Sequence, residues 1–339
     1  MRIMESVESP RVKRQLPDFS LFNEDCLETA KRLPEGSVGL VYADAPFFSG
    51  RRYKKRQFAF EDRWNGLDDY LAWINPRLRC FHRVLKDSGM LFIHSDWHAS
   101  HYIKMLADQI FGYRHFLNEI IWKRQSCHSD ARQGGRHFGR VHDTILVYSK
   151  SSNYVWNQQY APYEKAYVEH AYRFVEKETR RRYALGDLSG PGGASNGNPK
   201  YKFLGSEKYW RYSRQRMQEL RTTGRIHHVK GRVPKLKRYL DEMNGKPLQD
   251  IWSDIQPVSK SALDVGYPTQ KPEQLLDRII RTSTKRGQIV YEPFAGSAPG
   301  GAVSFKLARR WIGSDLSASA CRLVINRLRV LGCEDVLLY

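Results

Sequence analysis

Short apolar runs alternate along the chain with stretches whose apolar residues recur at steps of three and four. The runs span residues 19–22, 38–43, 90–94, 118–122, 142–148, 288–291 and 310–313. Those over residues 38–43 and 90–94 are almost wholly apolar, as expected for strands covered on both faces of a sheet. The periodic stretches predict amphipathic helices over residues 27–33, 67–85, 98–111 and 271–284, with a further helix that reaches Arg309. This alternation predicts an α/β domain with a mostly parallel central sheet.

The middle of the chain differs from these regular parts in charge and in aromatic content. Residues 123–250 hold 26 Lys and Arg residues against 12 Asp and Glu residues, a net +14 of the +20 carried by the whole chain. Three clusters there, residues 180–182, 210–214 and 235–239, combine cations with aromatic neighbours. Such a mixture suits contacts with phosphates and stacking on bases. A merely solvated basic face is the alternative.

Composition restricts the class of protein further. The chain has 339 residues, 41% of them hydrophobic, and a pI near 9.8. These values predict a folded protein whose partner is a polyanion such as DNA or RNA, with solubility as the alternative reason for the charge. The five cysteines are scattered without a C-x-x-C pair, so we expect neither a disulfide framework nor a cysteine zinc site, and no metal-binding residues are predicted. Because the chain shows no signal peptide and no run of about 20 apolar residues, we expect a soluble protein of a reducing compartment with no membrane partner.

A carboxylate directly follows the predicted strand over residues 38–43. Asp44 is followed by Ala45, Pro46 and Phe47, so an acid, a sharp turn and a flat ring lie together at the end of the strand. Asp44 could accept a hydrogen bond from a planar, amino-bearing substrate while Phe47 stacks on its face. The alternative is an ordinary strand-to-loop turn, because Asp and Pro are common turn formers.

Residues 288–315 predict a second site, built from a strand, a glycine-containing turn, a helix and a strand that ends on an acid. The turn is Glu-Pro-Phe-Ala-Gly-Ser over residues 292–297, and the acid is Asp315. A glycine lets a ligand approach the backbone closely, and an acid in this place can hold two ribose hydroxyls. A G-x-G-x-x-G sequence is absent, which argues against a nicotinamide dehydrogenase. The unit therefore predicts some other nucleoside-bearing cofactor.

Together these blocks resemble the amino-methyltransferases of DNA that use S-adenosylmethionine, and more narrowly their beta class. Residues 44–47 are similar to the catalytic D-P-P-Y/F block, and residues 267–272 to the P-T-Q-K-P signature. Residues 292–297 are similar to D-P-F-x-G-x, and residues 310–315 to R-R-W-I-G-x-D. The blocks occur in the order of the beta class. The resemblance implies a Rossmann-like methyltransferase fold with an inserted target-recognition region, S-adenosylmethionine as cofactor and double-stranded DNA as partner.

The resemblance and the composition together predict four parts of the chain. Residues 1–17 form a polar N-terminal arm, and residues 18–122 form the catalytic half of the methyltransferase domain. Residues 123–264 are predicted to be the basic aromatic insert for target recognition. Residues 265–339 complete the domain as its cofactor-binding half.

For the catalytic block the resemblance implies a role for each residue. Asp44 would accept a hydrogen bond from the target amino group and the Ala45 carbonyl would take the other N–H, which directs the nitrogen lone pair toward the sulfonium methyl group. Pro46 belongs to the turn, and Phe47 would stack on the base after it has flipped out of the duplex. Aspartate as first residue favours adenine N6, since cytosine-N4 enzymes usually begin with serine there. Methylation of cytosine N4 is the alternative.

The resemblance also implies the residues that hold the cofactor. Asp315 would hold the ribose hydroxyls, and Asp25 would lie near the adenine or methionine end. The start of the helix after residue 270 would lie near the methionine moiety. The whole predicted cofactor site consists of Asp25, Gln270, Lys271, Phe294, Gly296, Ser297 and Asp315.

Four positions depart from the family pattern. Ala45 stands for the first proline of the catalytic block, and Glu292 stands for aspartate. Ala298 and Pro299 stand where relatives carry glycine and threonine. A Cβ at Ala298 is expected to crowd a ligand that needs close backbone contact, and Pro299 removes an N–H donor from the cofactor end. A degenerate methyltransferase that binds nucleic acid without transferring methyl groups is therefore a further alternative.

The expected substrate also sets the expected surroundings of the protein. An enzyme that methylates prokaryotic or phage DNA works in the cytoplasm, at the nucleoid. A homodimer and a cognate restriction endonuclease are left open as partners, and RNA is an alternative substrate on charge alone. The recognition motif is not predicted, because base readout depends on which side chains reach the groove edges.

Overall fold

The computed structural model describes residues 16–125, 127, 134–258 and 264–339. It forms two compact units: a larger unit, made of the chain up to Gln159 and from Gln249 onward, and a smaller unit over Tyr160–Leu248. The smaller unit spans fewer residues than the predicted insert over residues 123–264. The reason is that β7 (His142–Ser149) and β16 (Ile251–Trp252) pair into the central sheet of the larger unit. Most of the predicted N-terminal arm, residues 1–15, lies outside the described residues.

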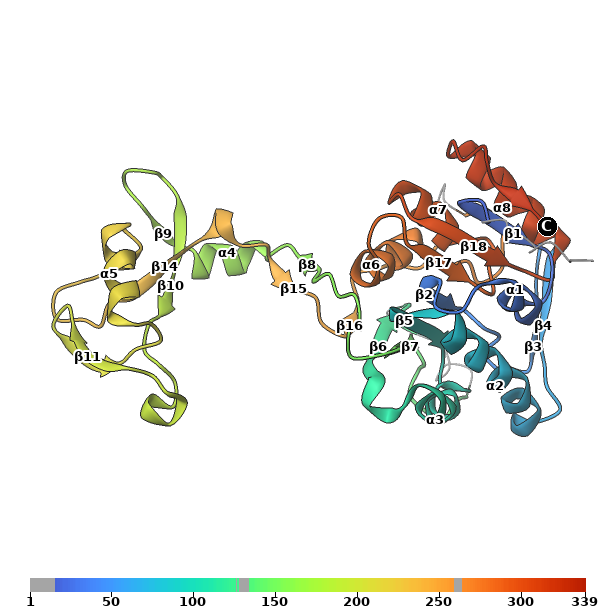
Figure 1. The fold of residues 1–339 in the computed structure, drawn as a ribbon, viewed down its shortest axis with the longest axis horizontal. Coiled ribbons are helices and arrows are strands. Elements are labelled where there is room, and N and C mark those ends of the chain that lie inside the picture. Colours follow the sequence, from blue (N-terminus) through green and yellow to red (C-terminus); the bar gives the residue numbers. More distant parts are fainter. Residues whose placement is uncertain (1–15, 126, 128–133, 259–263) are drawn as a thin grey trace, which may run out of the picture. The chain divides into compact units, whose positions relative to one another are not determined.

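Within the described residues, a nine-stranded sheet forms the centre of the larger unit (Figure 1). Its order is β16-β6-β7-β5-β2-β17-β18-β1-β19. Besides β7 and β16 its strands are β1 (Phe19–Phe22), β2 (Val38–Ala43), β5 (Leu85–Ser95), β6 (Phe116–Lys123), β17 (Ile289–Glu292), β18 (Arg310–Ser314) and β19 (Leu337–Leu338). The strands from β5 to β19 pair in parallel, while β7 lies antiparallel between β5 and β6. The prediction of a mostly parallel central sheet is confirmed.

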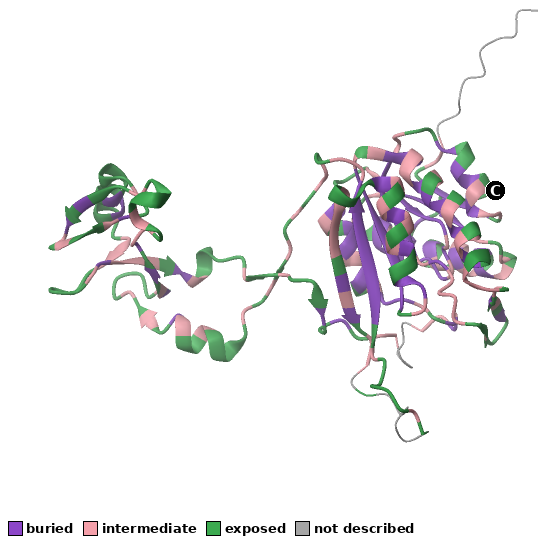
Figure 2. Ribbon diagram, turned by 90° about the horizontal axis from the view of Figure 1, so that it is seen from below, coloured by how far each residue is buried: buried purple, intermediate pink, exposed green. Residues whose placement is uncertain are grey.

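Helices cover both faces of this sheet and explain its sequence. One face packs against α6 (Glu273–Ser283), α7 (Pro299–Lys306) and α8 (Ala318–Val330), and the other packs against α1 (Cys26–Arg32), α2 (Leu67–Val84) and α3 (Ser100–Phe111). In β2, Leu40 and Tyr42 join the first core, and Val41 and Ala43 join the second. Successive side chains of a strand point to opposite faces, so a strand covered twice is apolar throughout. Figure 2 shows the central strands buried along most of their length.

Two local features differ from the predictions. Strand β5 begins directly after α2 ends at Val84, so it starts at Leu85 and not at residue 90 as the sequence predicts. The sequence also does not predict the hairpin of β3 (Arg51–Lys55) and β4 (Phe58–Asp62), because the charged run Arg-Arg-Tyr-Lys-Lys carries no apolar alternation. Among the described residues, no helix is both long enough and apolar enough to cross a membrane.

The smaller unit, which is described throughout, is built from short strands. A four-stranded sheet has the order β13 (Ile226–His227), β14 (Lys235–Tyr239), β10 (Arg182–Asp187) and β9 (Phe174–Val175). Two further pairs are β11 (Lys200–Phe203) with β12 (Ser206–Tyr209), and β8 (Tyr160–Ala161) with β15 (Lys246–Pro247). Helices α4 (Lys165–Ala171) and α5 (Arg214–Thr222) complete the unit. Its own core consists of Leu188, Tyr201, Phe203, Trp210 and Met217.

Two aromatic residues of the cation-rich clusters lie inside this smaller unit. Trp210 is 0% exposed and Tyr239 is 3% exposed, so the expectation that they stack on bases is wrong. Arg181 of another cluster forms ion pairs with Asp241 and Glu242. The smaller unit nevertheless holds 20 Lys and Arg residues against 9 Asp and Glu residues. It therefore remains strongly basic.

Candidate active site

The carboxyl ends of three neighbouring parallel strands meet at one edge of the sheet. Strand β2 is followed by Asp44, β17 ends on Glu292, and β18 is followed by Asp315. Because these strands are adjacent, the three acids line one cavity of about 620 Å³. The crevice outside the carboxyl ends of parallel strands is where open α/β sheets bind ligands. The two sites that the sequence predicts separately are thus parts of a single cavity.

The cavity brings together all of the predicted site residues. Its lining includes Asp25, Asp44, Ala45, Pro46, Phe47, Gln270, Lys271, Phe294, Gly296, Ser297 and Asp315. The β3–β4 hairpin contributes Tyr53, Phe58 and Phe60 to the wall, and α2 contributes Trp73. Aromatic rings therefore make up much of the cavity wall.

Lys271 is the immediate partner of Asp44. Its ammonium donates to both carboxylate oxygens at 2.7 Å, and its nitrogen lies 5.1 Å from the centre of the Phe47 ring. The two side chains are 8% and 20% exposed, respectively. Thr269, at the start of this segment, has a φ of 59°, a conformation that β-branched residues rarely adopt. The sequence places Lys271 only at the cofactor side, so its contact with Asp44 is a new finding.

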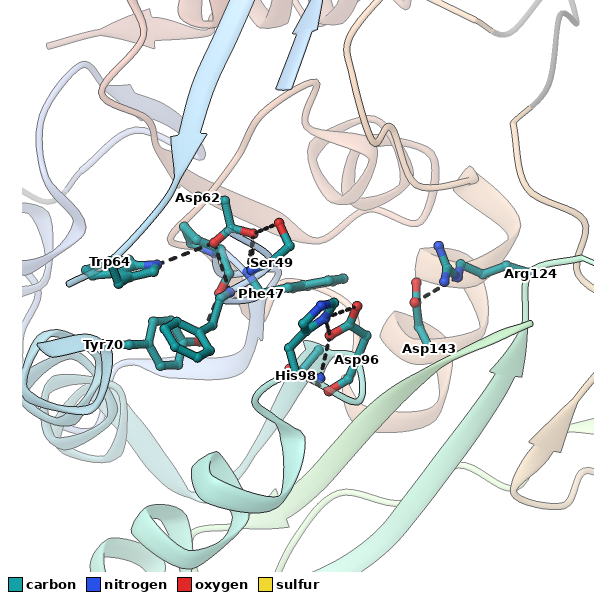
Figure 3. Close-up of polar contacts among 12 residues, drawn as sticks. Phe47, Ser49, Asp62, Trp64, Tyr70, Asp96, His98, Arg124 and Asp143 are labelled. Carbon is teal, nitrogen blue, oxygen red and sulfur yellow. Dashed lines mark hydrogen bonds and ion pairs between the residues drawn. The ribbon is translucent and has the colours of Figure 1, made fainter. Parts of the chain in front are cut away.

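A buried chain of polar groups lies behind the Phe47 ring. The ring stacks on His94 with centroids 5.7 Å apart and an interplanar angle of 25°. His94 Nδ1 lies 2.7 Å from the Tyr42 hydroxyl, and Nε2 lies 3.1 Å from Asp143 Oδ2. Arg124 forms an ion pair with Asp143 at 2.8 Å (Figure 3).

The hydrogen bond between His94 and Asp143 in this polar chain has a defined direction. Burial raises the pKa of Asp143, but its hydrogen bond with His94 and the surrounding positive charges together hold it below the ordinary value. An ionised carboxylate only accepts hydrogen bonds. His94 Nε2 therefore donates to Asp143, and its Nδ1 shares a hydrogen bond with the Tyr42 hydroxyl. This arrangement fixes the imidazole plane against which Phe47 rests.

On the other side of the cavity, Asp315 ties the glycine turn to the end of β18. Its Oδ2 accepts from the Gly296 amide and its Oδ1 from the Ser317 amide, both at 2.8 Å. Burial raises the pKa of this carboxyl above its ordinary value. Phe294 lies beside Trp73, with ring centroids 5.8 Å apart. An acid, a glycine turn and two rings thus converge on one part of the cavity.

Asp25 and Gln270 also hold the cavity wall together. Asp25 caps helix α1 by accepting from the Leu27 amide at 2.8 Å, and its second oxygen accepts from Arg77 at 2.6 Å. Gln270 Oε1 accepts from the amide of Val265 at 3.0 Å. Both side chains therefore have structural contacts that the sequence does not predict.

The turn at Ala298 does not have the effect that the sequence predicts. Ala298 adopts φ 46° and ψ 58°, a left-handed conformation that costs a non-glycine residue about 1–2 kcal/mol. It is 0% exposed and packs in the core, whereas its neighbours Ser297 and Pro299 line the cavity. The expectation that its Cβ crowds a ligand is therefore wrong. Pro299 begins helix α7, where a missing N–H is tolerated.

The Glu292 carboxyl is buried behind this turn. Its Oε2 accepts from Trp311 Nε1 at 3.0 Å, and its Oε1 accepts from the Gly300 amide at 3.3 Å. Burial raises the pKa of Glu292 to about 8. A Cβ on Gly300 would lie 2.7 Å from Oε2. The longer acid at position 292 therefore occupies the space that a side chain at position 300 would need.

Replacing Gly300 with Ala is expected to lower the free energy of unfolding by about 1–3 kcal/mol, because the added Cβ displaces a buried, hydrogen-bonded carboxyl. The change Glu292→Asp shortens the acid by one methylene and makes room for that Cβ. The double variant should therefore lose less free energy of unfolding than the sum of the losses in the two single variants. Urea unfolding of the four proteins measures this coupling, and strictly additive effects would show that the two positions do not depend on each other.

Comparison with known proteins identifies the family. The sequence model of the N6/N4 DNA methylases matches residues 38–326, so the chain belongs to the DNA methylase family, as the motifs predict. A type II methyltransferase of Enterobacter cloacae, M.EcaI, is 29% identical over 323 residues, which cover 93% of this chain and 70% of the relative. The DNA adenine methyltransferase YhdJ of Escherichia coli K12 is 26% identical over 315 residues, with 92% and 83% covered.

Two further comparisons concern a relative that matches over a smaller share of its length, and the fold. The Mod subunit of the type III restriction-modification enzyme StyLTI of Salmonella typhimurium is 27% identical, and the match covers 77% of this chain and 43% of that protein. A Thermus thermophilus protein assigned as a DNA modification methylase has been solved in complex with S-adenosyl-L-methionine. It superposes with a TM-score of 0.52 at 16% identity, covering 94% of this chain and 96% of that chain. The predicted methyltransferase fold is confirmed.

Sequence reasoning misses three contributors to the site. His94 closes the apolar run over residues 90–94 and Asp143 lies at the polar start of the run over residues 142–148, and a polar residue at the end of an apolar run is the signal that could have found them. Asp62, at the end of β4, carries no such signal because its hairpin is not predicted.

Proposed function

We propose that this protein is a site-specific DNA methyltransferase that transfers a methyl group from S-adenosylmethionine to the N6 amino group of adenine. The observation that carries the proposal is the placement of Asp44 and Phe47 in the same cavity as Asp315 and the glycine turn. An anionic acceptor beside a flat ring suits an amino-bearing base, and an acid beside a glycine turn suits a nucleoside. The similarity of YhdJ, a DNA adenine methyltransferase, over 92% of the chain supports adenine as the target.

The residues of the cavity fit S-adenosylmethionine. Gly296 has a φ of 53°, and a Cβ there would lie 2.9 Å from the Tyr267 ring, so only glycine keeps this wall of the cavity as it is. Asp315 retains lone pairs beyond its two amide bonds and would hold the ribose hydroxyls, while Phe294 offers an aromatic face. When bound, S-adenosylmethionine supplies an electrophilic methyl group.

Asp44 would orient the amino group that is methylated. One carboxylate oxygen accepts an N–H of that group and can hold the proton that the nitrogen loses. Lys271 donates to both oxygens at 2.7 Å, so it fixes the direction of the carboxylate before the base arrives. An acceptor that is already oriented needs little reorganisation during the reaction.

Phe47 would stack on the base and exclude water from one of its faces. The amino group of a paired base lies inside the duplex, so the base has to leave the helical stack to reach Asp44. The net charge of +20 supports a DNA duplex as the partner. The similarity to a restriction-modification subunit supports a role in such a system.

Identification of the methylated base tests this proposal. Purified protein is incubated with S-adenosylmethionine and DNA from a methylation-deficient host, and the digested nucleosides are analysed by mass spectrometry. We expect N6-methyladenine. N4-methylcytosine in its place would move the activity to cytosine. No methylated nucleoside, together with no calorimetric binding of S-adenosylmethionine, would identify a degenerate methyltransferase that only binds nucleic acid.

A further inference from the structure

Asp62 anchors the backbone that follows the Asp44–Phe47 turn. Its Oδ2 accepts from the amides of Phe47 and Ser49 at 3.2 and 3.0 Å, and from the Ser49 hydroxyl at 2.6 Å. Its Oδ1 accepts from the Phe48 amide at 2.8 Å (Figure 3). The residue is 1% exposed. Three consecutive amides therefore converge on one buried carboxylate, an arrangement in which backbone N–H groups bind an anion.

The turn that Asp62 holds is strained. Phe48 has a φ of 62°, in the left-handed region that aromatic residues rarely adopt. Such a conformation persists where surrounding contacts determine it fully. Besides Asp62, the Tyr70 hydroxyl fixes the turn by donating to the Pro46 carbonyl at 2.8 Å. Loss of the carboxylate would leave three half-buried amides without their acceptor and would release the turn toward an unstrained conformation.

The hairpin that carries Asp62 is itself tied to the far wall of the cavity. The Phe58 ring packs against Tyr267 with centroids 5.4 Å apart. Lys55, near the tip of the hairpin, forms an ion pair with Asp264 at 2.9 Å. Asp62 thus connects a fixed wall of the cavity to the segment that carries the Phe47 ring.

We propose that Asp62 is a positioning residue for methyl transfer: it fixes the backbone of residues 47–49 and thereby holds the Phe47 ring where the target base stacks. The inference rests on the proposed function, since it concerns the base that Asp44 and Phe47 receive. If Asp62 had a purely structural role, its replacement would lower stability and leave extrusion of the base unchanged. If it has a positioning role, its replacement lowers turnover and base extrusion in a protein that still binds its cofactor.

The test compares Asp62→Asn with a matched control, Asp108→Asn. The asparagine at position 62 keeps the volume of the side chain but presents an NH₂ group to N–H donors. Asp108 likewise accepts from two side chains, Tyr148 at 2.7 Å and Lys104 at 2.9 Å, but does not line the cavity. The measurements are kcat, KM for DNA, S-adenosylmethionine affinity by calorimetry, and the fluorescence of 2-aminopurine placed at the target base.

For Asp62→Asn we expect kcat to fall about 100-fold, the size of effect that a misplaced reacting group produces. The 2-aminopurine signal should be lost, while the affinity for S-adenosylmethionine changes less than about threefold. Asp108→Asn should lower the melting temperature, but the folded protein should keep both turnover and the fluorescence signal. Ser49→Ala removes one of the donors and leaves the amides in place, so it should lower kcat about 3- to 10-fold in a protein that folds normally.

Several results would overturn the inference. Turnover and fluorescence at wild-type levels in Asp62→Asn would overturn it. Losses of turnover and fluorescence that appear only where the Asp62→Asn protein unfolds, as expected for Asp108→Asn, would overturn it as well. If Asp62→Asn does not fold, unchanged turnover in Ser49→Ala has the same consequence. If the wild type transfers no methyl group, the proposed function fails, and a crystal structure of Asp62→Asn still decides the inference. We expect the Phe47 ring to have left His94, and an unchanged turn would contradict positioning by Asp62.

Discussion

Replacing Asp44 with Ala is expected to lower the rate of methyl transfer by about 100- to 1,000-fold, the loss seen when one group that stabilises a transition state is removed. The variant loses the acceptor for the target amino group. It also leaves the Lys271 ammonium, whose side chain is 8% exposed, without its carboxylate partner. The measurement is single-turnover transfer of a labelled methyl group to DNA. Binding of S-adenosylmethionine should be retained, because Asp315 and the glycine turn are untouched.

A matched control separates this effect from the general cost of removing an ion-paired aspartate. Asp254 pairs with Arg278 at 2.5 Å and does not line the cavity. Asp254→Ala should therefore keep its transfer rate within about threefold of the wild type, as surface substitutions usually do. If Asp44→Ala retains as much activity as Asp254→Ala, the carboxylate at residue 44 is not the acceptor.

Replacing Asp315 with Ala is expected to weaken the binding of S-adenosylmethionine by about 10- to 100-fold. Hydrogen bonds to a charged group contribute about 1.5–3 kcal/mol, and each 1.4 kcal/mol is a factor of about ten in affinity. The change also removes the acceptor of the Gly296 and Ser317 amides, each 2.8 Å from the carboxylate, so the turn itself loses support. Isothermal titration calorimetry measures the dissociation constant.

Asp315→Asn is the control for side-chain volume in that experiment. It keeps one acceptor oxygen but turns an NH₂ group toward one of the two amides, so its affinity should lie between those of the wild type and Asp315→Ala. Circular dichroism at the titration temperature shows that the variants are folded. An unchanged dissociation constant in folded Asp315→Ala would exclude this acid from the cofactor site.

The central sheet could be predicted from sequence because its strands are buried on both faces. In β2 the continuous apolar run from Val38 to Ala43 serves two cores at once, and such a short, unbroken run is typical of a strand covered twice. The β3–β4 hairpin could not be predicted, since β3 is largely exposed and charged along most of its length and β4 is only five residues long. The early start of β5 was also beyond the sequence pattern, because Ser88 and Gly89 suit a turn before a strand as well as a bend within one.

The candidate site was predictable where an acidic residue directly follows an apolar strand. Asp44 and Asp315 both follow apolar strands, and parallel pairing then brings them to the same edge. Contacts between distant segments were not predictable. The ion pair of Asp44 with Lys271 spans 227 positions in sequence, and the anchoring of residues 47–49 by Asp62 depends on a hairpin that leaves no pattern. Spacing alone also misplaced the Ala298 Cβ, because the left-handed turn directs it into the core.

The central claim is that Asp44 serves methyl transfer to adenine in DNA. Modification-sensitive long-read sequencing of DNA from a host that expresses the wild-type protein or Asp44→Ala tests this claim most directly. We predict N6-methyladenine at one short motif in the first sample and none at that motif in the second. The same methylation in both samples, or unmodified wild-type DNA from a protein that binds S-adenosylmethionine, would contradict it.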